Sequence, residues 1–161
     1  MRESSPENRI ADYVVMNRES IYRLAYSYVK NTEDALDIVQ ESIYKAISSK
    51  ASLKEPEYIR TWFYRIVVNT SLDLLRKQKR LVVVDDEAMA SLDTGMSDDY
   101  RDFDLHRALD DLPDNYRSII VLRYFEDLKI EEVAEILNEN ISTVKTRLYK
   151  SLQKLRMEMK K

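Results

Sequence analysis

Apolar residues recur at helical spacing along most of the chain. One set follows the i, i+3, i+4, i+7 pattern of an amphipathic helix: Ile21, Leu24, Ala25 and Tyr28. After it, Asn31 can cap a second helix, and Glu33 and Asp34 add first-turn acids that suit the helix dipole. The apolar positions of that second helix are Ala35, Ile38, Val39, Ile43, Ala46 and Ile47. No strand pattern or internal repeat competes, so the sequence predicts an all-α fold.

A longer amphipathic helix is predicted next. Residues 48–57 lack the pattern and are expected to form a loop, with Pro56 near the start of the following helix. That helix is predicted to run to about Lys79. Its predicted buried face consists of Ile59, Trp62, Phe63, Ile66, Thr70 and Leu74.

Periodicity disappears from Val82 to Asp102, an acidic stretch that contains the only glycine, Gly95. Beyond it, two sets of apolar positions predict short helices: Leu105, Leu109 and Leu112 before Pro113, then Tyr116, Ile119, Ile120 and Tyr124. We therefore predict two small helical domains, residues 8–80 and 104–161, joined by a flexible acidic linker, residues 81–103.

The last two predicted helices have the proportions of a helix-turn-helix. They are Ile130–Leu137 and a helix from Ile141, separated by a three-residue turn. Asn138 tolerates the left-handed backbone that such a turn often needs, and Asn140 is a good N-cap.

On a helical wheel, the helix from Ile141 has one apolar arc: Val144, Leu148, Leu152 and Leu155. The rest mixes hydroxyls with cations, which suits contacts to phosphates and base edges in the major groove. We name this set the hydroxyl–cation face: Thr143, Lys145, Thr146, Arg147 and Lys150. A merely solvated face would show the same pattern, so the pattern alone leaves both interpretations open.

The long helix carries a second candidate DNA surface, here named the polar stripe: Arg65, Asn69, Asp73, Arg76 and Arg80. The amide of Asn69 can hydrogen-bond a base edge. Asp73 can simply pair with Arg76 or Lys77, three and four residues away. Trp62 and Tyr64, if exposed, could stack on unpaired bases, although we expect Trp62 in the core.

The preceding helix has an opposite surface, here named the acidic face: Asp34, Asp37, Gln40 and Glu41. Asp37 and Glu41 repel each other mildly at i, i+4, and only Lys45 offers local relief. A solvated face is the ordinary explanation of such a row. A docking face for a basic partner is the sharper alternative.

The net charge of −3 conceals a segregation of charge. Residues 60–80 hold six basic residues against Asp73, and residues 141–161 hold seven against Glu158. Between them, residues 85–104 hold eight acids against Arg101. Two basic helical segments thus flank an acidic connector, a pattern that suits nucleic-acid binding better than the net charge indicates.

Composition disfavours an enzyme. One glycine leaves no material for a phosphate-binding Gly-rich loop, and the absence of cysteine removes zinc ribbons and thiol chemistry. The lone His106 beside Arg107 is a poor catalytic site. We expect no catalytic residues, no metal and no cofactor. A polar N-terminus and apolar runs of about four residues predict a cytoplasmic protein that does not insert into a membrane.

Three motifs carry a family resemblance. Asn31 to Glu41 spells N-T-E-D-A-L-D-I-V-Q-E, and a W-x-x-x-I-x-x-N-x-x-x-D-x-x-R pattern runs from Trp62 to Arg76. An L-P-x-x-Y-R … T-V-K-T-R-L-Y pattern runs from Leu112 to Tyr149. In order and separation these motifs resemble those of the extracytoplasmic-function (ECF) sigma factors of the sigma-70 family. The sequences of residues 26–31 and 36–42 resemble the sigma-V subgroup. Two departures lie in the turn, where Asn138 replaces the usual glycine and Glu139 the usual apolar residue.

The resemblance implies a role for each surface. The acidic face would dock on the coiled coil of the largest subunit of core RNA polymerase. The polar stripe would engage the −10 promoter element, and the loop of residues 48–57 would hold a flipped non-template base. The hydroxyl–cation face would contact the −35 element. The linker would thread toward the polymerase active centre, and an anti-sigma factor, often membrane-anchored, would cover these faces.

Two other functions compete at this level. A stand-alone helix-turn-helix regulator would bind duplex DNA directly as a dimer, whereas a sigma factor needs core polymerase for promoter-specific transcription. An all-helical adaptor or anti-sigma-like protein would leave both basic surfaces dispensable.

Overall fold

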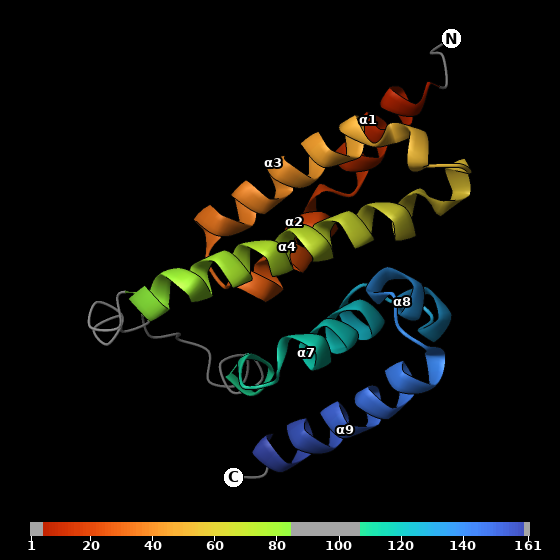
Figure 1. Ribbon diagram of the computed structural model, residues 1–161. Coiled ribbons are helices and arrows are strands. Elements are labelled where there is room, and N and C mark those ends of the chain that lie inside the picture. The colour runs from red at the N-terminus through yellow and green to blue at the C-terminus, as the bar shows by residue number, and fades with distance from the viewer. Residues whose placement is uncertain (1–4, 85–106, 160–161) are drawn as a thin grey trace. The chain divides into compact units, whose positions relative to one another are not determined.

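The computed structural model describes residues 5–84 and 107–159 (Figure 1), and every regular element among them is helical. The chain divides into two compact units, the first formed mainly by residues 1–76 and the second mainly by residues 77–161. The elements are α1 (Pro6–Met16), α2 (Arg18–Val29), α3 (Thr32–Ser48), η1 (Lys50–Ser52), η2 (Pro56–Tyr58), α4 (Ile59–Val84), α7 (Asp114–Ile120), η3 (Val121–Phe125), α8 (Ile130–Leu137) and α9 (Ile141–Met159). The all-α prediction is confirmed.

The core of the first unit forms where α1, α2, α3 and α4 pack together. The predicted face of α2 is confirmed, because all four of its apolar positions are buried. In α3, Ala35, Ile38 and Ala46 are buried as expected, whereas Ile47 is exposed. The ring of Tyr13 on α1 lies 5.7 Å from that of Phe63, which ties α1 to α4.

Apolar spacing did not predict helix α1, although the residues at its N-terminus are typical of a helix start. The Ser5 hydroxyl accepts a hydrogen bond from the Asn8 backbone N–H at 3.1 Å, so Ser5 is the N-cap. Pro6 stands at the first helical position and Glu7 adds a first-turn acid. A capping serine followed by proline and an acid is a typical helix start.

The start of α3 matches the prediction. The Asn31 side-chain oxygen accepts a hydrogen bond from the Asp34 backbone N–H at 2.8 Å. Just before it, Lys30 takes a left-handed conformation at φ 62° and closes α2 by donating its N–H to the Tyr26 carbonyl. A cap on each side therefore makes the α2–α3 corner tight.

Helix α4 differs from its prediction in length and in its buried face. It continues to Val84 instead of ending near Lys79, because residues 80–84 contain no glycine or proline to stop it. Phe63 and Thr70 are buried as predicted, but Ile59, Trp62, Ile66 and Leu74 are only half-buried. Tertiary packing instead buries a wider arc that a single apolar stripe did not predict: Tyr64, Val67, Val68 and Ser71.

The second unit is built on α7, η3 and α9, with the first residues of α8. Its described core contains Leu109, Leu112 and Ile120, against which Tyr116 of α7 and Leu148, Leu152 and Leu155 of α9 pack. Helix α7 continues into η3, one turn of π-helix. Tyr124 lies in this turn and is exposed. The prediction for the apolar arc of α9 is confirmed, with Val144 fully buried.

The turn between α8 and α9 closes as a Schellman motif. Asn138 has φ 55°, its N–H donates to the Glu135 carbonyl at 3.2 Å, and the Glu139 N–H donates to the Ala134 carbonyl at 2.9 Å. Asparagine thus supplies the left-handed residue that glycine usually provides, and the predicted helix-turn-helix is confirmed.

Several sequence predictions fall outside the described residues. Residues 85–106 include most of the predicted acidic linker, with Gly95, Leu105 and His106. The first four linker positions, residues 81–84, belong to α4.

Candidate functional site

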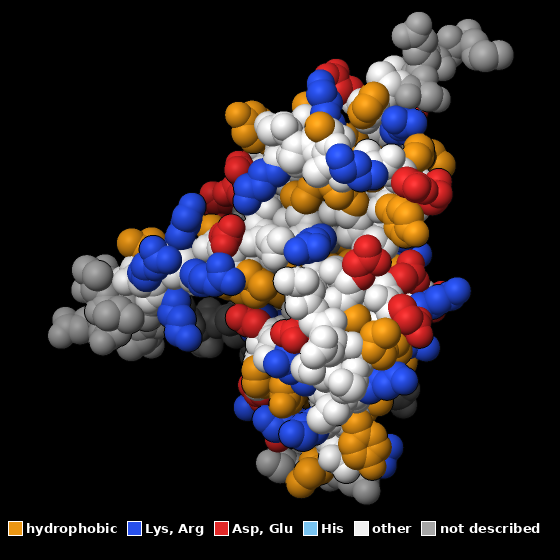
Figure 2. All heavy atoms as spheres, turned by 45° about the vertical axis from the view of Figure 1, so that its right-hand side comes forward, with side chains coloured by type: hydrophobic (Ala, Val, Ile, Leu, Met, Phe, Trp, Pro, Cys, Tyr) orange, Lys and Arg blue, Asp and Glu red, His pale blue; other side chains and the backbone are white. Residues whose placement is uncertain are grey.

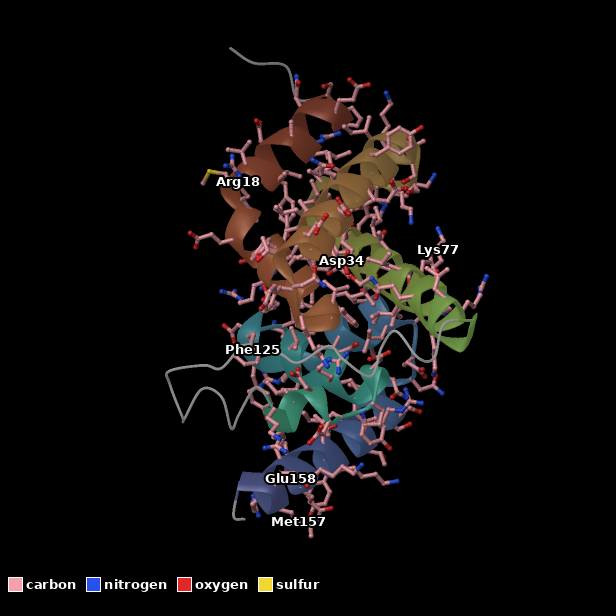
Figure 3. All side chains as sticks on the ribbon, turned by 90° about the vertical axis from the view of Figure 1, so that its left-hand side faces the viewer. Arg18, Asp34, Lys77, Phe125, Met157 and Glu158 are labelled. Atoms are coloured by element: carbon pink, nitrogen blue, oxygen red, sulfur yellow. The ribbon has the colours of Figure 1, made fainter. Side chains whose placement is uncertain are left out.

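The acidic face lies on the outer side of α3. Asp37, Gln40 and Glu41 are exposed, whereas Asp34 is half-buried. The Asp34 carboxylate accepts a hydrogen bond from the Asn31 side-chain amide at 2.9 Å, beside the cap of the helix (Figure 3). Asp34 therefore takes part in closing the α2–α3 corner, while Asp37 and Glu41 are free to meet a partner.

Lys45 does not relieve the repulsion between Asp37 and Glu41 as predicted. Its ammonium donates to the Thr70 hydroxyl at 3.2 Å and lies 3.9 Å from the Asp73 carboxylate. The reason is tertiary: α4 offers Lys45 two oxygens across the helix interface. Within the described part of the chain, Asp37 and Glu41 have no ion-pair partner.

The acidic face continues into apolar residues that the periodicity analysis did not single out. Leu36, Tyr44 and Ile47 are 50%, 69% and 42% exposed on α3. Exposed apolar groups beside uncompensated carboxylates are typical of an interaction surface rather than of a solvated face. The sequence does show these apolar residues at helical spacing from Asp37 and Glu41, and that spacing could have predicted an apolar extension of the acidic face.

The polar stripe runs along α4 with all five of its side chains exposed. Arg76 Nη1 donates to Asp73 Oδ1 at 2.8 Å, which confirms the predicted i, i+3 pair. Figure 2 shows Lys and Arg side chains gathered over the C-terminal part of α4. Lys77, labelled in Figure 3, projects from the same helix and adds to this positive surface.

The two aromatic candidates near the stripe differ from expectation. Tyr64 is 1% exposed, with the Arg60 guanidinium 5.7 Å from its ring centre, so it cannot stack on a base. Trp62 was expected in the core but is half-buried, and its indole N–H donates to the Ser52 hydroxyl at 2.9 Å. Trp62 therefore links α4 to the loop of residues 48–57.

That loop contains the short turns η1 and η2. Lys50 of η1 forms an ion pair with Glu7 of α1, and this pair holds the pKa of Glu7 below its ordinary value. Toward the other end, a hydrogen bond with Glu57 and its negative charge raise the pKa of Glu55. The loop is thus tethered at η1 and carries two mutually interacting carboxyls next to η2.

The hydroxyl–cation face lies on α9 in the second unit. Lys145, Thr146 and Lys150 are exposed, and Thr143 and Arg147 are half-buried. The Thr146 hydroxyl donates to the Ser142 carbonyl at 3.0 Å, so its proton is engaged while its oxygen can still accept. Tyr149 of the same helix is 66% exposed.

Within the described residues, no group of three or more His, Cys, Asp or Glu side chains could hold a metal ion. No helix among them combines the length and apolar character that a membrane span requires.

Comparisons with known proteins cover both units. The family described as Sigma-70 region 2 matches residues 13–81, and the family Sigma-70, region 4 matches residues 102–155. The chain is 57% identical to RNA polymerase sigma factor SigV of Bacillus subtilis (strain 168) over 90% of its length and 87% of that protein. The chain belongs to the ECF sigma factors of the sigma-70 family.

Three further comparisons agree. ECF RNA polymerase sigma factor SigW of the same organism is 31% identical over 96% of this chain and 90% of that protein. The sigma factor RpoE of Bartonella quintana, solved with the anti-sigma factor NepR, has a TM-score of 0.79 at 22% identity, over 93% of this chain and 96% of that one. CnrH, solved with the cytosolic domain of CnrY, has a TM-score of 0.69 at 20% identity, over 94% of this chain and 87% of that one. These structures share the fold.

As a sigma factor, the protein is a transcription initiation factor that binds core RNA polymerase and directs it to promoters. A stand-alone helix-turn-helix regulator is disfavoured, because the first unit is sigma region 2 rather than a sensing domain.

Proposed function

We propose that the acidic face on α3 is the polymerase-docking surface of this ECF sigma factor, contacting the coiled coil of the largest subunit. One observation carries this assignment: Lys45 is held by Thr70 and Asp73, which leaves the exposed carboxylates of Asp37 and Glu41 without a counter-charge. A basic partner would supply it. The adjoining apolar residues Tyr44 and Ile47 would add buried area to the same contact.

The polar stripe on α4 is proposed to engage the −10 element. Asn69 would hydrogen-bond a base edge, while Arg65, Arg76 and Arg80 would contact phosphates. Asp73 is paired with Arg76 and near Lys45, so its proposed role is to orient Arg76. The loop of residues 48–57 would receive an extruded non-template base.

The hydroxyl–cation face on α9 is proposed to bind the −35 element in the major groove. Exposed Lys145 and Lys150 would provide the salt-dependent attraction to phosphates. The contacts near the start of the helix would come from Thr143, Thr146 and Arg147. On the opposite side, Val144 is buried and Leu148, Leu152 and Leu155 pack against the core, which would leave the hydroxyl–cation face for the DNA.

An anti-sigma factor is proposed as the regulatory partner, since two of the similar solved structures are complexes with such proteins or with the cytosolic domain of a partner. The protein would act in the cytoplasm, where core polymerase works. The polymerase would carry out the catalysis, and this chain would have no catalytic residues.

The proposed domain bounds are residues 8–80 and 104–161. The two family matches, to residues 13–81 and 102–155, support these bounds.

The test is run-off transcription from a cognate promoter with core polymerase. We expect Asp37→Arg with Glu41→Arg to abolish the transcript and the pull-down of core enzyme. Glu19→Arg, an exposed acid on α2, is the matched control and should retain both. Full activity of the double variant would contradict the docking assignment.

Charge reversal of Lys145 and Lys150 should instead lower transcription only from promoters that depend on the −35 element. Core binding should be unchanged in these variants, which separates the two surfaces.

A further inference from the structure

The η1 turn is held from two sides by residues far away in the sequence. Lys50, its first residue, pairs with Glu7 in the first turn of α1. Ser52, its last residue, accepts a hydrogen bond from the Trp62 indole N–H on α4 at 2.9 Å. A turn of three residues is thus tied to two different helices of the first unit.

The turn is also closed internally, and Ser52 is the centre of its bonding. The Ser52 backbone N–H and hydroxyl both donate to the Ser49 carbonyl, at 2.8 and 2.7 Å, and the Leu53 N–H donates to the Lys50 carbonyl at 3.1 Å. The Ser52 hydroxyl therefore donates to Ser49 while it accepts from Trp62. Such a chain of hydrogen bonds is mutually strengthening.

Both tethers are exposed, which is unusual for bonds whose role is to hold a core together. Ser52 and Glu7 are exposed, and the large apolar side chain of Trp62 is only half-buried. Exposed ion pairs and surface hydrogen bonds contribute little to global stability. What they restrict here is the conformation of the residues that follow, Leu53 to Glu57.

We propose that Glu7, Lys50, Ser52 and Trp62 form a clamp that positions the loop of residues 53–57 for the extruded non-template base. This inference rests on the proposed role of the loop. A loop that binds an unpaired base gains affinity when it is already ordered, because no conformational entropy is then lost on binding. Trp62 and Ser52 are therefore positioning residues, and the clamp sets how strictly one −10 base is selected.

The experiment uses the full chain with core polymerase and a promoter series with all four bases at each −10 position. We expect Ser52→Ala and Trp62→Phe each to lower the discrimination between bases at one position by roughly 3- to 10-fold, the effect of one hydrogen bond. Both variants remove the Trp62–Ser52 bond, and Ser52→Ala also removes the hydroxyl bond to Ser49. The double variant should therefore lose no more than Ser52→Ala alone. Discrimination at the −35 element should not change.

The ion pair is tested by charge reversal. Glu7→Lys or Lys50→Glu should each weaken discrimination at the same −10 position by less than about 3-fold, since the pair is exposed. The combined variant should restore it. Glu19→Gln and Ser27→Ala are controls: Glu19 is also a first-turn acid, and the Ser27 hydroxyl bonds only its own helix, at the Leu24 carbonyl.

Circular dichroism checks that each variant keeps its helices; Ser52 is exposed, so Ser52→Ala tests the clamp even if Trp62→Phe unfolds. If Ser52→Ala keeps the wild-type preference at every −10 position, the clamp is wrong. If the wild-type chain itself selects no −10 base while still supporting transcription, the proposed role of the loop is wrong instead.

Discussion

Arg117 is a charged residue that the second unit buries, at 4% exposure. Its guanidinium donates to the Leu112 carbonyl at 3.3 Å, to the Asp110 carbonyl at 3.5 Å and to the Asp114 carboxylate at 2.6 Å. In the L-P-x-x-Y-R motif this arginine therefore closes the corner before α7, a structural role that the motif alone does not reveal.

Replacing Arg117 by methionine should destabilise the second unit by roughly 1.5–3 kcal/mol, because two carbonyls lose a charged donor in a buried place. Hydrogen exchange of amides in α7 and α9 measures this locally, which matters because the lone tryptophan reports on the first unit. Arg156→Met, at an exposed site, is the control. Equal protection in both variants would contradict the role of Arg117.

Glu7 provides a pH-dependent prediction. Lys50 lowers the pKa of Glu7 in the folded protein, so the pair's contribution is present above the unfolded pKa and is lost as pH falls through the folded one. A side-chain NMR titration should place the Glu7 midpoint below the ordinary value for a glutamate carboxyl. In Lys50→Gln the difference should vanish; an unchanged Glu7 midpoint would show that Lys50 is not its partner in solution.

At the scale of elements, end caps determine where the surfaces start. The Asn31 cap fixes the first turn of α3, and the left-handed Asn138 fixes the angle at which α9 follows α8. Because an α-helix has 3.6 residues per turn, inserting one residue at either cap would rotate the following side chains by about 100° relative to the core.

Asn31→Ala should cost about 1 kcal/mol of the stability of the first unit, since the Asp34 N–H loses its acceptor. Urea unfolding followed by Trp62 fluorescence measures the loss. Asn31→Asp, which can still cap, should stay within a few tenths of a kcal/mol of the wild type. Identical midpoints for the alanine and aspartate variants would argue against the cap.

At the scale of the whole molecule, the two proposed DNA surfaces lie mainly on different units. The polar stripe belongs to α4 and the hydroxyl–cation face to α9. Substitutions on the two surfaces should therefore act independently.

We expect the losses in transcription caused by Asn69→Ala and Lys150→Ala to multiply in the double variant. Each single loss should be specific to its promoter element, and Lys150→Ala should also reduce the salt dependence of promoter binding by about one unit of slope. If the double variant transcribes as much as the less active of the two single variants, the two contacts are made in one coupled step.

Much of the local structure was predictable because it depends on neighbours in the sequence. The buried sides of α2 and α9 follow from apolar spacing, and the cap at Asn31 and the left-handed Asn138 follow from side-chain chemistry at one position. The exposure of the polar stripe also followed from periodicity. Helix α1 could have been predicted in the same way from Ser5 and Pro6.

What the sequence could not determine depends on which helices meet. Periodicity left Tyr64 as a candidate for base stacking, and packing on several sides of α4 buries it. Local spacing assigned Lys45 to Glu41, and α4 engages it instead through Thr70 and Asp73. The tethers from Glu7 to Lys50 and from Trp62 to Ser52 join segments up to 43 residues apart. The helices and their polar faces follow from the sequence, because apolar spacing and capping are local properties. Which polar groups are already paired, and which are left for a partner, follows only from the fold, because it depends on which helices meet.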